Sequence, residues 1–150
     1  SPHQQKYPIR VFKMRQIVLK GRVIVEGCCK AEALVSTKPI SFLGGVDPAN
    51  GRIIEKNHAI IGECIKDKVL CFPHGHGSTV GSYVLYSLAK KKLAPRAIVN
   101  QTADTVVAVG AIIANIPMID QIDIKQIETG DIVEVNACKG SVKILKRKGS

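Results

Sequence analysis

The sequence lacks several features that mark common functional classes. Tryptophan is absent and aromatic residues make up only 4% of the 150 residues, so few side chains can stack on bases or sugars. The longest apolar run, residues 106–119, is shorter than the roughly 20 residues that a membrane-spanning helix needs. The opening stretch SPHQQKYPIR has no apolar core of the kind found in a secretory signal. These absences favour a soluble, cytoplasmic protein without a membrane or nucleic-acid partner.

Cysteine is present, but not in a pattern that indicates a metal site. The five cysteines include no CxxC pair, and their odd number argues against a disulfide framework. Cys71 lies in an apolar stretch, where a free thiol usually acts as a small buried hydrophobe. His74 and His76 have no nearby carboxylate or cysteine to complete a zinc site. We therefore expect reduced thiols and no metal bound by this chain alone.

Acidic residues are few compared with basic ones. The 12 Asp and Glu stand against 22 Lys and Arg, which gives a formal net charge of +10. Such a surface attracts nucleic acid, an anionic substrate or an acidic partner subunit. Lys90, Lys91 and Lys92 end a predicted helix, where cations suit the helix dipole. We therefore expect partner contacts and a small anionic substrate.

The length and the 45% hydrophobic content fit one domain with a sizeable core. We assign residues 1–15 to an N-terminal extension, residues 16–146 to the domain and residues 147–150 to a basic tail. Alternating apolar residues predict a strand before and after Gly21.

Further elements follow from turn signals and periodicity. Short strands are predicted at 31–35 and 40–43, and the stretch GGVDPANGR (44–52) predicts either a wide hairpin loop or a loop that touches a ligand or partner. Residues 68–72 and 96–100 are predicted strands, and residues 129–146 a hairpin turning near Lys139–Gly140. The order predicts an α/β fold, a compact sheet or partial barrel flanked by helices.

Two helices are predicted between these strands. Apolar residues at helical spacing from Gly81 to Ala89 form one face of the first helix. The second runs from about Asp104 to Asn115, with Thr102 or Asp104 as its N-cap. It is apolar nearly all round, so we expect it to be buried on most sides, with a second protein chain among its possible neighbours.

The loop in CFPHGHGSTVGS (71–82) is the main candidate site. Gly75 and Gly77 let the backbone approach an anion, and the following helix offers free N–H groups. Ser78 or Thr79 falls where an N-cap would sit, so the loop is either an anion site or a capped turn. The P-loop signature is missing, which disfavours nucleotide hydrolysis, and the nucleophile elbow GxSxG is missing as well. A serine alkoxide stabilised at a helix end could take a proton from carbon.

Four stretches, in order, resemble the small subunit of the aconitase X family: residues 44–58, 72–100, 103–120 and 129–136. The resemblance covers about residues 16–144 and implies a swivelling β/β/α domain, like the mobile last domain of aconitases. It also implies a heterodimer with a large subunit, which holds a [4Fe-4S] cluster through its own cysteines.

The resemblance further implies a reaction and its residues. Archaeal members dehydrate (R)-mevalonate 5-phosphate to trans-anhydromevalonate 5-phosphate in an isoprenoid pathway, and bacterial relatives dehydrate cis-3-hydroxy-L-proline. The family's Gly-x-Gly-Ser base corresponds to Ser78, with substrate contacts expected at Gly75, His76, Gly77 and Thr79. His76 replaces the usual Arg or Lys, so any anion contact there should strengthen as the imidazole is protonated. Asp47 would touch the substrate or the large subunit.

Two other classes stay open. A phosphohistidine carrier domain shares the swivelling architecture, and His74 or His76 would then accept phosphate. A basic nucleic-acid-binding module is the third hypothesis, which the scarcity of aromatic residues opposes.

Overall fold

The computed structural model describes residues 16–149, so the predicted N-terminal extension lies outside the described residues. Within this range the strands form one eight-stranded sheet in the order β1-β8-β7-β3-β4-β5-β6-β2. The strands are β1 (Ile17–Lys20), β2 (Arg22–Val25), β3 (Cys28–Val35), β4 (Val69–Phe72), β5 (Ala97–Asn100), β6 (Met118–Asp120), β7 (Ile132–Asn136) and β8 (Ser141–Lys146). The helices are α2 (Phe42–Gly45), α3 (Gly81–Lys90), α4 (Thr105–Ala114) and the 3-10 turn η2 (Ile124–Gln126).

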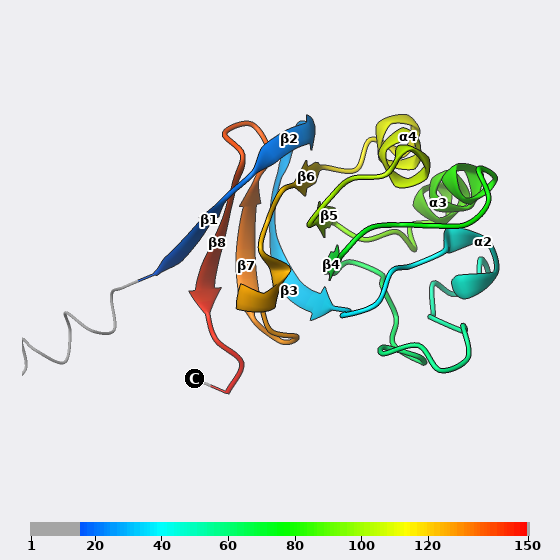
Figure 1. Cartoon of the computed structure of the whole chain (residues 1–150), viewed down its shortest axis with the longest axis horizontal. Coiled ribbons are helices and arrows are strands. Elements are labelled where there is room, and N and C mark those ends of the chain that lie inside the picture. The colour runs from blue at the N-terminus through cyan, green and yellow to red at the C-terminus, as the bar shows by residue number, and fades with distance from the viewer. Residues whose placement is uncertain (1–15, 150) are drawn as a thin grey trace, which may run out of the picture.

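The sheet bends at β3 into two layers. Residues 28–32 of β3 pair antiparallel with β7, and residues 33–35 pair parallel with β4. Strands β3, β4, β5 and β6 are mutually parallel, and α3 and α4 cover the outer side of this half (Figure 1). The molecule is therefore a three-layer β/β/α sandwich, which confirms the predicted fold class.

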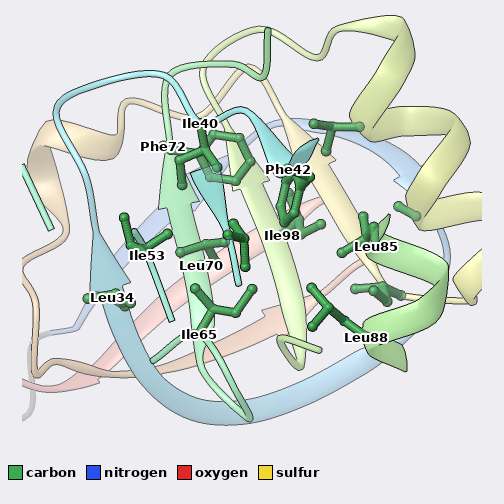
Figure 2. Close-up of a cluster of buried hydrophobic side chains, with 14 of the residues drawn as sticks. Leu34, Ile40, Phe42, Ile53, Ile65, Leu70, Phe72, Leu85, Leu88 and Ile98 are labelled. Atoms are coloured by element: carbon green, nitrogen blue, oxygen red, sulfur yellow. The ribbon is translucent and has the colours of Figure 1, made fainter. Parts of the chain in front are cut away.

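Each pair of layers encloses its own apolar core. Between the two sheet layers lie side chains such as Val69, Val99 and Val135, all fully buried. Between the parallel strands and the helices lies a second core, in which Phe72, Leu85 and other labelled side chains meet (Figure 2). Each face of the central strands packs against one core, so β4 and β5 are buried along their whole length.

Gly21 separates two consecutive strands that lie at opposite edges of the sheet. β1 pairs with β8, β2 pairs with β6, and β1 does not pair with β2. A Cβ at Gly21 would collide with the carbonyl oxygen of Asp120, and the Gly21 N–H donates to Gly140 O at 2.8 Å. The sheet therefore stays open, and a single chain segment spans its two edges.

Most predicted elements are confirmed, and two differ. Residues 40–43 are not a strand: only Ile40 forms a bridge, and Phe42 turns into α2, an irregular turn in which Gly44 has a φ of 88°. The buried Phe42 ring packs edge-on against Phe72 at 6.3 Å, so tertiary packing outweighs the local strand propensity. Strand β6, three residues long and directly after Pro117, was not predicted.

The ends of other elements follow the sequence closely. Asp104 caps α4, and the predicted hairpin forms from β7 and β8. The loop from Val46 to Ile53 is closed by an antiparallel bridge, as expected for a wide hairpin loop. Among residues 16–149, no helix combines the length and apolar character needed to cross a membrane.

Candidate active site

The loop of residues 73–80 leaves β4 at the carboxyl edge of the parallel strands. In open α/β sheets this edge is where ligands bind, because side chains and backbone from several neighbouring strand ends meet there. The loop runs between two supports, the Ile40 segment and the first turn of α4. Its position is thus set by residues distant in the sequence.

Gly75 fixes the loop to α4. Its N–H donates to Asp104 Oδ1 at 2.8 Å, while Asp104 Oδ2 accepts from the N–H groups of Val106 and Val107 at 3.1 and 3.3 Å. A Cβ at Gly75 would collide with the Val107 side chain and lie 2.7 Å from Asp104 Oδ1. Gly75 is therefore buried against the α4 cap, and its N–H is engaged rather than open to an anion.

The two histidines flank Gly75 along a short parallel bridge. Ile40 N–H donates to His74 O at 3.3 Å, and His76 N–H donates to Ile40 O at 3.1 Å. His74 Nδ1 lies 2.7 Å from Gly75 O. The His76 side chain is exposed and makes no hydrogen bond within the described part of the chain. Both imidazoles are exposed, but only that of His74 contacts the backbone of the described chain.

Residues 77–79 combine an exposed hydroxyl with unpaired backbone donors. Gly77 has a φ of +92°, and a Cβ there would lie 2.5 Å from Ser41 Oγ. Within residues 16–149, the N–H groups of Gly77, Ser78 and Thr79 donate to no protein acceptor. Unpaired N–H groups around a positive-φ residue are the arrangement that binds anions in proteins.

Ser78 also opens the turn that leads into α3. Its Oγ accepts from Val80 N–H at 3.1 Å, and its carbonyl accepts from Gly81 N–H at 3.0 Å. The assigned N-cap, Val80, contributes no side-chain hydrogen bond, so Ser78 provides the side-chain acceptor of this turn. The capping and site interpretations of Ser78 are thus compatible, because its side chain stays exposed while accepting this bond.

Asp47 lies in a different place. Its Oδ1 accepts from Ala49 N–H at 2.9 Å, and its carbonyl accepts from Gly51 N–H at 2.8 Å, so it stabilises its own loop. Lys91 Nζ donates to Pro48 O at 3.0 Å, which places this loop at the C-terminal end of α3. Ser78 precedes the N-terminus of that ten-residue helix, about 15 Å away along its axis. This chain therefore does not bring Asp47 and Ser78 together.

An ion pair between a buried carboxylate and an exposed arginine, which sequence reasoning missed, supports the loop. Asp120, at the end of β6, accepts from Arg22 Nε at 2.9 Å and Arg22 Nη2 at 2.8 Å, and from Ala103 N–H at 2.9 Å. Burial opposes ionisation, but the hydrogen bonds from Arg22 and Ala103 outweigh it, so the pKa of Asp120 lies below its ordinary value. Ala103 precedes the Asp104 cap, so this pair fixes the start of α4.

Two further features at this edge lie outside the predicted site. A pocket of about 290 Å³ lies beside Pro73; its lining is Val35, Ser36, Thr37, Pro73, Gln101, Ile124, Lys125 and Ile127. Asn100, buried at the end of β5, donates to Phe72 O at 3.0 Å, but its Oδ1 has no partner in the described chain. The sequence pointed to these features only in that the predicted strands 68–72 and 96–100 end beside them.

Known proteins have sequences and a fold similar to those of this chain. A family model for the aconitase X swivel domain matches residues 18–144. A phosphomevalonate dehydratase small subunit from Methanosarcina acetivorans is 50% identical over 140 residues, covering 91% of this chain and 97% of that protein. The protein of the same name from Thermococcus sibiricus is 56% identical over 126 residues, covering 84% of this chain and 97% of that protein.

A solved structure agrees with these matches. The crystal structure of Thermococcus kodakaraensis aconitase X superimposes with a TM-score of 0.85 at 51% identity, covering 87% of this chain and 99% of the matched chain. On sequence and structure together, the chain belongs to the aconitase X swivel-domain family.

Proposed function

We propose that this chain is the small subunit of a hydro-lyase that dehydrates (R)-mevalonate 5-phosphate to trans-anhydromevalonate 5-phosphate. The name shared by the archaeal relatives at 50% and 56% identity supports this substrate. The observation that carries the catalytic assignment is the exposed Ser78 hydroxyl, flanked by the unpaired N–H groups of residues 77–79.

Ser78 is the proposed proton acceptor. In the reaction the base takes a proton from the carbon next to the carboxylate, and the electron pair of that C–H bond forms the C=C bond. The β-hydroxyl departs with the electron pair of its C–O bond and takes up a proton to become water. The Val80 N–H that points at Ser78 Oγ favours the negative charge of an alkoxide, and the N-terminal end of α3 adds partial positive charge. A serine in this position can therefore act as a base, although a serine hydroxyl in water does not.

The backbone around Ser78 is proposed to hold an anionic group of the substrate. The N–H groups of Gly77 and Thr79 lie on either side of Ser78 and have no protein acceptor in the described chain. His76 is exposed next to them, and the excess of basic residues attracts a substrate that carries both a carboxylate and a phosphate. Gly75 contributes indirectly, because it holds the loop on the α4 cap.

The larger subunit is proposed to supply an iron–sulfur cluster, whose iron would act as a Lewis acid on the departing hydroxyl. Residues of this chain do not fit such a group. Burial raises the pKa of the Cys71 thiol, which disfavours the thiolate that a cluster ligand must be. Across residues 16–149, no three His, Cys, Asp or Glu side chains are placed to hold a metal ion.

The test is to co-express this chain with its larger subunit under anaerobic conditions and to assay mevalonate 5-phosphate. We expect Ser78→Ala to lower kcat by about 10²–10⁴-fold, as for loss of a general base, while the complex stays intact. Ser87→Ala, in the same α3 helix, is the matched control and should retain activity. Equal turnover by Ser78→Ala would refute the base assignment. Turnover of cis-3-hydroxy-L-proline instead would refute the substrate assignment alone.

A further inference from the structure

The outer side of the helical layer exposes several large apolar side chains. Tyr83 in α3 is 68% exposed, and Ile112 in α4 is 58% exposed. We call this surface the helical apolar face; it consists of Leu43, Val80, Tyr83, Tyr86, Val109, Ile112 and Ile113. Apolar residues that cluster in this way mark an interaction surface more often than isolated ones do.

Close packing of α3 and α4 makes these residues one surface. A Cβ at Gly110 of α4 would lie 3.2 Å from Ser82 Cα of α3, and a Cβ at Gly81 would lie 3.3 Å from Val106 Cγ1. These glycines bring the two helix axes together along their length, and the helices lie side by side on one side of the sheet (Figure 1). The exposed stripes of the two helices therefore face solvent next to each other.

The charges on the two helices that form this face have one sign. Neither α3 nor α4 contains Asp or Glu, and α4 has no charged residue at all. Lys90, Lys91 and Lys92 are exposed at the C-terminal end of α3, and Lys90 Nζ lies 5.8 Å from the centre of the Tyr86 ring. A second copy of this chain would bring like charges together, whereas a partner with acidic residues around an apolar centre would be attracted.

The helical apolar face is continuous with the candidate site. Leu43 and Val80 lie at its site end, because a Cβ at Gly81 would be 3.5 Å from Leu43 N. Val80 also donates its N–H to Ser78 Oγ. A partner that completes the site at Ser78 would therefore cover Leu43 and Val80. The rest of the helical apolar face extends this contact along both helices.

We propose that the helical apolar face is the docking surface for the larger subunit, which meets it with an apolar centre and an acidic rim. This inference rests on the proposed function, since it takes the larger subunit as the partner. It assigns α4, which lacks charge and is apolar nearly all round, to an interface as well as to the core. Interfaces of this kind bury an apolar centre and leave charged groups at the rim.

Titration of purified chain variants against the larger subunit tests the assignment. We expect Ile112→Glu and Val109→Glu each to weaken binding at least about 10-fold, because each buries an unpaired charge in the interface. Val18→Glu is the matched control: Val18 is 43% exposed and Val109 is 41% exposed, but Val18 lies on β1 in the other sheet layer. Lys90→Glu should slow association and reduce its salt dependence.

The possible outcomes test the docking surface separately from the proposed function. If the unchanged chain does not bind the larger subunit, the proposed function is wrong. If it binds and the helix variants bind equally well, the docking surface is wrong while the proposed function stands. If the isolated chain forms a dimer that Ile112→Glu abolishes, a second copy covers the face and the inference is overturned. Circular dichroism and Tyr83→Ala, which truncates without adding charge, distinguish lost binding from lost folding.

Discussion

Asp120 and Asp131 are the two buried carboxylates among residues 16–149, and they support different regions of the molecule. Asp120 binds Arg22 from β2 and the Ala103 N–H, beside the cap that holds the Ser78 loop. Asp131 binds Arg147 at 2.7 Å, together with two backbone N–H groups, and holds the C-terminal strand against the preceding turn. Both regions have the same arrangement, in which a buried carboxylate accepts hydrogen bonds from an arginine and from backbone N–H groups.

The two regions differ in the backbone N–H groups that remain without an acceptor. Around Asp131 the chain is engaged in the β7–β8 hairpin, and the predicted basic tail is fastened to it through Arg147. Around Asp120 the supported loop still presents the open N–H groups of residues 77–79. A binding site needs a rigid support with unsatisfied hydrogen-bond donors. We therefore expect a functional role for the region around Asp120 and a purely structural role for the region around Asp131.

The largest expected effect comes from removing each carboxylate in turn. Asp120→Ala and Asp131→Ala should each lower the free energy of unfolding by about 2–4 kcal/mol, because each removes a buried carboxylate together with its charged hydrogen bonds. Only Asp120→Ala should also lower the kcat of the folded complex, since it releases the start of α4. Urea unfolding and turnover per folded molecule measure the two effects. Equal kcat values would remove the functional difference between the regions.

A smaller effect should distinguish two glycines of similar conformation. Gly77 and Gly44 have φ values of +92° and +88°, but only Gly77 has a neighbour, Ser41 Oγ, where a Cβ would go. Gly44→Ala should cost about 1 kcal/mol from backbone strain alone, and Gly77→Ala about 2 kcal/mol. Thermal unfolding measures both. If Gly77→Ala costs no more than Gly44→Ala, the segment around Ser41 moves to make room for the added Cβ.

The smallest effect is a dependence on pH. Because the pKa of Asp120 is lowered on folding, the unfolded chain binds more protons in acid than the folded chain does. This contribution to stability is therefore present above about pH 4, the unfolded carboxyl range, and is lost as the pH falls through the folded pKa. Asp120→Asn should make the free energy of unfolding fall less steeply as the pH drops below the unfolded carboxyl range. An unchanged slope would mean that other carboxylates dominate.

The sequence by itself determined the elements whose signals are local. Periodicity located α3 and α4, turn residues located the β7–β8 hairpin, and Asp104 was one of two predicted caps for α4. Each of these rests on interactions between residues a few positions apart, which the order of side chains specifies directly. The loop containing Ser78 was found in the same way, as a glycine-rich turn between a strand and a helix.

Only the tertiary structure decided which distant segments meet. It placed β1 and β2 at opposite edges on either side of Gly21, turned residues 40–43 into a support for the site loop, and separated Asp47 from Ser78. It also joined Arg22 to Asp120 across 98 positions of the chain. Such contacts depend on the packing of whole layers, and no local pattern specifies them because burial and pairing are shared among many residues.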